Sequence, residues 1–273
     1  MGYHTLLVIV GEEKGLDRRL ETARLLAQRF DAHVIGLHVL PPPLLPVGYG
    51  EAVAYVGPDL VEAQRRAQRR RAEQLKARFS ELLGELAPAV AWREVEGDPR
   101  QVTLDAAHVA DLTLVPQTED RGLEAIEPNV AEYLAMGAGG PVLVLPRCDW
   151  SLPVGRRILV GWNGSRQACR ALHDALPLMA GAEQVVLAAL GDAAQASLED
   201  ALGLLARHGV EARGLPLAAA ARPGAALLEQ VREQGADLLV MGAYGHSRLR
   251  ELILGGTTRY VLQRAEVPVL ASS

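Results

Sequence analysis

Two pairs of glycines near the end of the chain have the spacing of a phosphate-binding loop. Gly242 and Gly245 follow the apolar run at residues 236–241, and Gly255 and Gly256 come after nine intervening residues. Glycine lets an anion approach the backbone closely, and the free N–H groups at the start of a following helix attract negative charge. The pattern therefore predicts a phosphate site, although such glycines also occur as ordinary turn residues.

This spacing resembles the nucleotide signature of the universal stress proteins, Gly-x2-Gly-x9-Gly followed by a small residue and threonines. In that family the signature holds the ribose and phosphates of ATP. The ending at residues 267–270 (VPVL) also resembles the family's last strand. The resemblance implies that this part of the chain binds ATP, or the related AMP or ADP, with Mg²⁺ accompanying the phosphates. The implied site consists of Gly161, Trp162, Asn163, Ala189, Met241, Gly242, Gly245, His246, Gly255, Gly256, Thr257 and Thr258.

Buried strands and amphipathic helices alternate along the chain, which predicts an α/β fold with a mostly parallel sheet. In the first half, strands are expected at residues 5–10, 33–40, 90–95, 111–115 and 141–146, and helices at 16–30, 59–86 and 100–109. In the second half, strands are expected at 157–162, 184–190, 210–215, 236–241 and 267–270, and helices at 166–179, 198–208, 225–234 and 259–265.

The second half repeats the first. Residues 110–115 (ADLTLV) match 236–241 (ADLLVM), and residues 140–143 (GPVL) match 267–270 (VPVL), about 126 residues later in each case. An internal duplication of this length predicts two similar structural units.

With the resemblance, the duplication predicts two tandem open five-stranded sheets, mostly parallel and flanked by helices, of the Rossmann-like adenine-nucleotide-binding type. The expected domains are residues 1–147, a degenerate copy, and residues 154–273, which carry the glycine motif, with 148–153 as the linker. The resemblance implies that the two copies pack together as the family's homodimers do. It also allows a homodimer of the whole chain.

Two substitutions in the second half are expected to weaken nucleotide binding. Asn163 stands where relatives that hold ATP usually have an aspartate that receives the adenine amino group. Gly256 stands where they more often have a hydroxyl that reaches a phosphate. Each loss is worth about 1 kcal/mol, so together they weaken binding by roughly ten- to a hundred-fold. Arg248 and Arg259 are candidates for supplying compensating positive charge.

The first half is predicted not to bind nucleotide. Pro116 and Gln117 begin the segment that replaces the Gly-x-x-Gly, and Glu124 and Glu127 fall where the second glycine pair should be. Near the expected adenine position, the acidic pair at residues 12–13 adds further negative charge. Carboxylates at these places repel a triphosphate.

The composition excludes several classes of protein. Of 273 residues, 49% are hydrophobic and 22% charged, which is typical of a folded globular protein, and the net charge of −5 argues against nucleic-acid binding. The basic run at residues 65–71 is interleaved with glutamates on its predicted helix, as expected for a solvated helix face. Two cysteines, no leader peptide and no membrane-spanning run predict a cytoplasmic protein with no membrane partner.

No set of residues in the sequence forms a catalytic motif. The seven histidines lack metal-ligand spacing such as His-Glu-x-x-His, and no Gly-x-Ser-x-Gly nucleophile elbow is present. The sequence therefore favours a nucleotide-responsive stress protein that binds and regulates, without being an enzyme, although some relatives hydrolyse ATP slowly. One alternative is a member of the family that acts through protein contacts or another small ligand. Another is an α/β enzyme such as a dehydrogenase or a transferase, and the absence of Gly-x-Gly-x-x-Gly after either first strand counts against the dehydrogenase.

Overall fold

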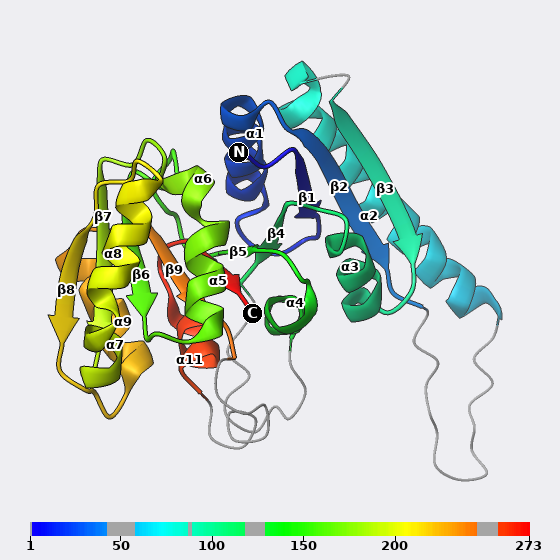
Figure 1. The fold of residues 1–273 in the computed structure, drawn as a ribbon. Helices are drawn as coiled ribbons and strands as arrows, with labels where there is room; N and C mark the ends of the chain where they lie inside the picture. The colour runs from blue at the N-terminus through cyan, green and yellow to red at the C-terminus, as the bar shows by residue number, and fades with distance from the viewer. Residues whose placement is uncertain (1, 43–57, 87–88, 118–128, 245–255) are drawn as a thin grey trace, which may run out of the picture.

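The computed structural model describes residues 2–42, 58–86, 89–117, 129–244 and 256–273. In these residues ten strands form one sheet with the order β3-β2-β1-β4-β5-β10-β9-β6-β7-β8 (Figure 1). The strands are β1 Thr5–Ile9, β2 His33–Leu40, β3 Val90–Glu96, β4 Leu112–Pro116, β5 Val142–Leu145, β6 Arg157–Trp162, β7 Gln184–Leu190, β8 Arg213–Leu217, β9 Leu238–Gly242 and β10 Val269–Ser272.

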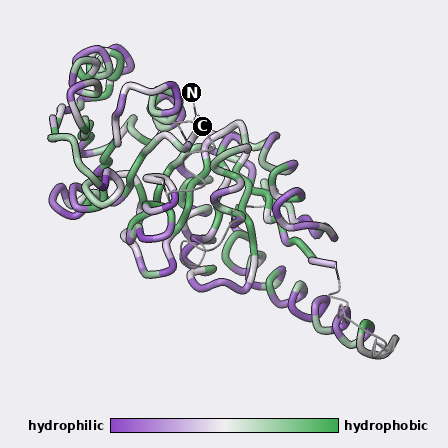
Figure 2. Tube along the Cα trace, turned by 90° about the horizontal axis from the view of Figure 1, so that it is seen from below, coloured by the Kyte–Doolittle hydropathy of each residue, from purple (hydrophilic) through white to green (hydrophobic). Residues whose placement is uncertain are grey.

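Helices lie on both faces of this sheet. They are α1 Leu16–Phe30, α2 Pro58–Leu83, α3 Pro99–Ala107, α4 Val130–Gly137, α5 Arg166–Asp174, α6 Leu176–Met179, α7 Asp192–Ala196, α8 Leu198–Arg207, α9 Pro223–Glu233 and α11 Thr257–Arg264, with a 3-10 turn η1 at Gly84–Leu86. In Figures 1 and 2 the amino-terminal turns of α2 extend beyond the sheet. No helix in the described ranges is long and apolar enough to cross a membrane.

The predicted fold class is confirmed. Each half contains five parallel strands, and the chain visits them in the same way: the first strand pairs with the second and the fourth, and the fifth lies beside the fourth. The two sheets are not separate, because β5 and β10 pair antiparallel, with Leu143 opposite Leu270. The sequence did not predict that the two edge strands would join.

The alternation of side chains along each strand divides the core into two layers. On β1, Leu6 and Val8 point to the face covered by α1, α2, α5 and α8, whereas Leu7 and Ile9 point to the face covered by α3, α4, α9 and α11. Strands buried on both faces are continuously apolar, which is why their sequences are runs of Val, Ile and Leu (Figure 2). The same helix faces the same side in both halves, as expected of a duplicated unit.

The sequence analysis missed helix α4. Asn129 accepts a hydrogen bond from the Glu132 amide at 2.9 Å, and the Glu132 carboxylate accepts one from the Asn129 amide at 3.4 Å. This reciprocal pair is a capping box, and the Asn-x-x-Glu spacing was the signal that could have revealed the helix start.

The segment at residues 148–153, predicted as a linker, is anchored to the first half. The Trp150 side chain is buried, and its indole N–H donates to the Thr22 hydroxyl of α1 at 3.3 Å. Arg18, also on α1, donates to the Trp150 carbonyl at 2.9 Å. The connection between the halves is therefore packed against the core and is not a free tether.

Candidate functional site

Of the predicted site residues of the second half, those on β6, β7 and β9 lie together at one edge of the sheet. Parallel pairing sets Gly161 beside Met241 and Trp162 beside Ala189, so the carboxyl ends of β6, β7 and β9 lie next to one another. The start of α11 follows β9 in the chain. In open α/β sheets ligands bind at this edge, beside the first strand, where the strand order reverses. Gly245, His246 and Gly255 lie outside the described residues.

Several of these side chains already have partners inside the protein. Trp162 is 7% exposed and its indole N–H donates to the Ser197 hydroxyl at 3.0 Å, so it belongs to the core. Asn163 is exposed, but its side-chain oxygen accepts the Ser165 amide at 3.1 Å. Ala189 and Met241 are buried. Of these four positions, Asn163 is the one with an exposed side chain.

Gly242 is required by the packing of helix α5. A Cβ atom built on Gly242 would lie 2.5 Å from the Ala168 amide nitrogen and 2.6 Å from the Gln167 carbonyl carbon. Both atoms are in the first turn of α5, which Ser165 caps by accepting the Ala168 amide at 3.2 Å. The first glycine of the motif thus lets a helix lie on the end of β9, whatever it does for a ligand.

The start of α11 differs from the equivalent start of α4. Gly256 is the N-cap residue of α11 and has no side chain to cap this end, whereas Asn129 and Glu132 cap α4. Thr258 is buried and its hydroxyl accepts the Tyr244 amide at 3.2 Å, which ties the end of β9 to α11. Within the described residues, the first turn of α11 therefore keeps the positive end of its dipole without a cap from its N-cap residue.

Helix α11 is held near both ends by residues of the first half. At its carboxyl end, the side-chain amide of the buried Gln117 donates to the backbone carbonyls of Leu262 and Ala265, both at 3.0 Å. In its first turn, Arg259 Nε lies 3.4 Å from a carboxylate oxygen of Glu132, and both side chains are largely buried. Arg259 thus faces the first half, and the expectation that it supplies charge to a phosphate finds no support in this geometry.

Gln117 also makes a third hydrogen bond at the junction of the halves. Its side-chain oxygen accepts the Arg147 backbone amide at 3.2 Å. With the offset of 126 residues between the repeats, Gln117 aligns with Ala243, and Pro116 aligns with Gly242. The alanine at position 243 could make none of these three side-chain bonds, so Gln117 has a structural role that its counterpart in the second half lacks.

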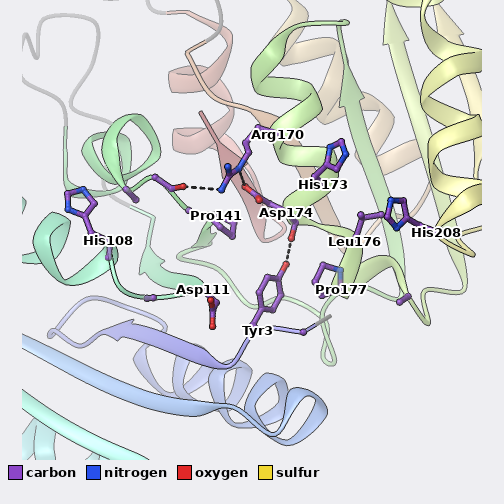
Figure 3. A pocket seen from close by; sticks show the side chains of 17 residues that line it. Tyr3, His108, Asp111, Pro141, Arg170, His173, Asp174, Leu176, Pro177 and His208 are labelled. Atoms are coloured by element: carbon purple, nitrogen blue, oxygen red, sulfur yellow. Dashed lines mark hydrogen bonds and ion pairs between the residues drawn. The ribbon is translucent and has the colours of Figure 1, made fainter.

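A cleft of about 890 Å³ lies between the halves at the opposite edge of the sheet (Figure 3). Two of its polar side chains bond across the junction: the Tyr3 hydroxyl donates to the Asp174 carbonyl, and Arg170 donates to the Gly139 carbonyl at 3.1 Å while also pairing with Asp174 of its own helix at 2.8 Å. Burial raises the pKa of the Tyr3 phenol, so it remains a protonated donor. Asp111 accepts the amides of residues 4 and 5. We interpret this cleft as part of the contact between the halves.

Two doubly wound halves, each with the strand order reversing beside its first strand, define a Rossmann-like α/β protein. The chain belongs to the universal stress protein family, whose model matches residues 2–146 and 217–272. A universal stress protein of Synechocystis sp. is 47% identical over 45 residues, a match that spans 16% of this chain and 16% of that protein.

Solved structures share the fold over almost the whole chain. A universal stress protein from Archaeoglobus fulgidus is 18% identical with a TM-score of 0.78, and the match covers 98% of this chain and 96% of that one. A Pseudomonas aeruginosa chain described as a member of the same family is 16% identical with a TM-score of 0.63, covering 99% and 93%. At these identities the likeness concerns the fold alone.

Proposed function

We propose that the second half binds ATP or a related adenine nucleotide, AMP or ADP, with the phosphates at the start of α11. The observation that carries the proposal is the contrast between the two copies of this helix. The capping box of α4 engages the amides of Asn129 and Glu132, whereas the N-cap residue of α11, Gly256, has no side chain that could engage an amide of its first turn. A helix start of this kind favours phosphate.

In this proposal the protein is a nucleotide-responsive binding module and not an enzyme. In the described part of the chain, no cluster of three or more His, Cys, Asp or Glu side chains is placed to hold a metal ion. Mg²⁺ would enter with the phosphates. Residues 1–147 and 154–273 are the two proposed domains, and the β5–β10 pairing supports their acting as one unit.

One observation favours a second candidate, a member of the family that does not hold nucleotide. The Asn163 oxygen that would receive the adenine amino group already accepts the Ser165 amide. This contact uses one of the two lone pairs of that oxygen and so reduces what the site offers to adenine. Weak binding is therefore expected even under the leading proposal.

Replacing Gly256 by aspartate tests the phosphate site. The backbone at Gly256, with φ −53° and ψ 170°, accepts an L-residue, and aspartate is a good N-cap. Gly256→Asp is expected to leave stability unchanged or raise it by a few tenths of a kcal/mol. Because the new carboxylate caps the amides and repels phosphate, affinity for Mg·ATP should fall by roughly a hundred-fold. Isothermal titration calorimetry with Mg·ATP measures the dissociation constants of the unmodified protein and of the variant.

The control is Gly256→Ala, which adds a methyl group without charge or a cap and should change affinity by less than about threefold. Unaltered ATP binding in Gly256→Asp would contradict the placement of the phosphates. An absence of heat from the unmodified protein at millimolar ATP and AMP would favour the second candidate.

A further inference from the structure

The first half contains a cavity at the edge where open α/β sheets bind ligands. It lies at the carboxyl ends of β1, β2 and β4, and α2, α3 and the first residue of α4 complete its walls. Its volume is about 540 Å³, within the usual range for small-molecule sites. This half was predicted not to bind nucleotide, so the cavity raises the question of what chemistry it does fit.

The inner surface of the cavity is mainly aliphatic. The strand ends contribute Ile9, Val10, Leu40 and Val115, and α4 adds Val130. Ile9, Val10 and Val115 are almost completely buried within the protein, so the apolar surface that a ligand can contact comes mainly from the partly buried Leu40 and Val130. Covering this surface with an apolar body is favourable at about 25 cal/mol per Å² of area removed from water.

The charges that a ligand could reach are predominantly negative. The Glu13 carboxylate lies over Gly11, with both oxygens 2.5 Å from an ideal Cβ on that glycine. Glu13 is 46% exposed, whereas its partner Arg19, 3.3 Å away, is 1% exposed and so is hidden from the cavity. Glu12 pairs with Arg71 at 3.4 Å, and both are more than half exposed. Among the described lining residues, two carboxylates and one guanidinium are therefore accessible, while Arg19 offsets part of the Glu13 charge from within the protein. This arrangement offers no accessible excess of positive charge to a polyphosphate, and its accessible carboxylates favour a single cation.

Three polar side chains on the walls use donor groups within the protein. His38 Nδ1 donates to the Val10 carbonyl at 2.9 Å. The Thr103 hydroxyl donates to the Pro99 carbonyl at 2.6 Å. Gln68 donates to a backbone carbonyl at 3.1 Å. These donors have acceptors within the protein, so a ligand that brings its own donors fits best.

We propose that this cavity binds a small apolar amine, that is, a ring or short hydrocarbon carrying one ammonium group near Glu12 and Glu13. The ammonium supplies the donors and the positive charge, and the apolar body fills the space between the strand ends and α4. The proposal rests on the described walls of the first half. It is independent of nucleotide binding in the second half, and either can fail without the other.

The test uses two probes with the same ring and opposite charge. Tryptamine carries an ammonium group, and indole-3-propionate carries a carboxylate on a chain of similar length. Calorimetric titration of the whole chain should give a dissociation constant below about 1 mM for tryptamine and a value at least tenfold higher for the carboxylate. Equal affinity for the two probes, or no binding of tryptamine, would overturn the proposal.

Two variants locate the binding. Glu12→Gln removes an accessible carboxylate from an exposed pair and should weaken tryptamine binding about fivefold while thermal stability is retained. Its matched control is Glu183→Gln, which removes a carboxylate from an exposed pair with Arg156 in the second half and should change nothing. Leu40→Trp should fill the cavity and abolish binding of tryptamine.

A competition experiment separates this site from the nucleotide site. Mg·ATP at saturating concentration is expected to leave the tryptamine dissociation constant unchanged within twofold. Displacement of tryptamine by ATP would show that the cavity is the nucleotide site and would overturn the proposal, as would unchanged tryptamine binding in Leu40→Trp.

Discussion

Gly242→Ala is expected to lower the free energy of unfolding by about 3 kcal/mol, the upper end of the cost of overpacking a core. The added methyl group would meet backbone atoms of Gln167 and Ala168 at 2.5–2.6 Å, and backbone at the start of a helix cannot rotate away as a side chain can. Helix α5 must therefore move off the end of β9, which also disturbs the core beneath it. The loss should appear in urea denaturation whether or not nucleotide is present.

Gly203→Ala is the matched control for this prediction. Gly203 lies within α8, and an added Cβ would meet only the flexible end of Arg207 at 3.4 Å. The same substitution is expected to raise stability there by about 0.5–1 kcal/mol, because alanine favours the helix. If Gly242→Ala unfolds like the unmodified protein and has merely lost ATP binding, then the glycine serves the ligand and not the helix.

The positions of the elements around Gly242 could be predicted from the sequence, but the contact that requires this glycine could not. The buried strand that ends at Gly242 and the helix that begins after Gly256 were both predicted, since apolar runs and helical periodicity mark those elements directly. The packing reason for a glycine at position 242 could not be predicted from the sequence. The close approach of α5 involves a segment some seventy residues earlier in the chain. Motif spacing indicates that a glycine permits a close approach to the backbone, but tertiary packing determines which neighbouring group makes that approach.

The boundaries of the elements were predicted where the pattern was local. The ranges for α1, β2, β6 and β7 agree with the structure, since each begins and ends at a change of hydrophobic pattern. The third strand of the second half was placed at residues 210–215 and is found at Arg213–Leu217. This edge strand is only partly buried, so its pattern is weak. The joining of β5 to β10 depends on contacts between halves, which no local pattern carries.

The junction between the halves contains a buried ion pair that links the two copies of one helix. Glu132 on α4 and Arg259 on α11 are 3% and 15% exposed, with 3.4 Å between Arg259 Nε and the carboxylate. Gln263 also donates to the carboxylate, at 3.1 Å. Burial raises the pKa of Glu132, and the attraction of Arg259 together with these hydrogen bonds opposes that rise. The carboxylate is thus stable as an anion only while its partners remain.

Arg259→Met should therefore lower the free energy of unfolding at pH 7 by about 3–5 kcal/mol, the cost of leaving a buried charge unpaired. The double variant with Glu132→Gln should recover most of that loss, because no charge then remains to be compensated. Arg156→Met, which breaks an exposed pair with Glu183, is the control and should cost less than about 1 kcal/mol.

The loss in Arg259→Met should also depend on pH. Without Arg259 the pKa of Glu132 in the folded protein rises further above its value of about 4.3 in an unfolded chain. A carboxyl group whose pKa is raised by folding binds its proton more tightly in the folded state, so stability increases as the pH falls toward the unfolded value. Urea denaturation at pH 7 and pH 5 should thus show a smaller deficit at pH 5. A deficit that stays constant, or one no larger than that of Arg156→Met, would mean that Glu132 is not a buried anion. Because this pair fixes the first turn of α11, a real deficit at pH 7 should be accompanied by weaker Mg·ATP binding at the same helix start.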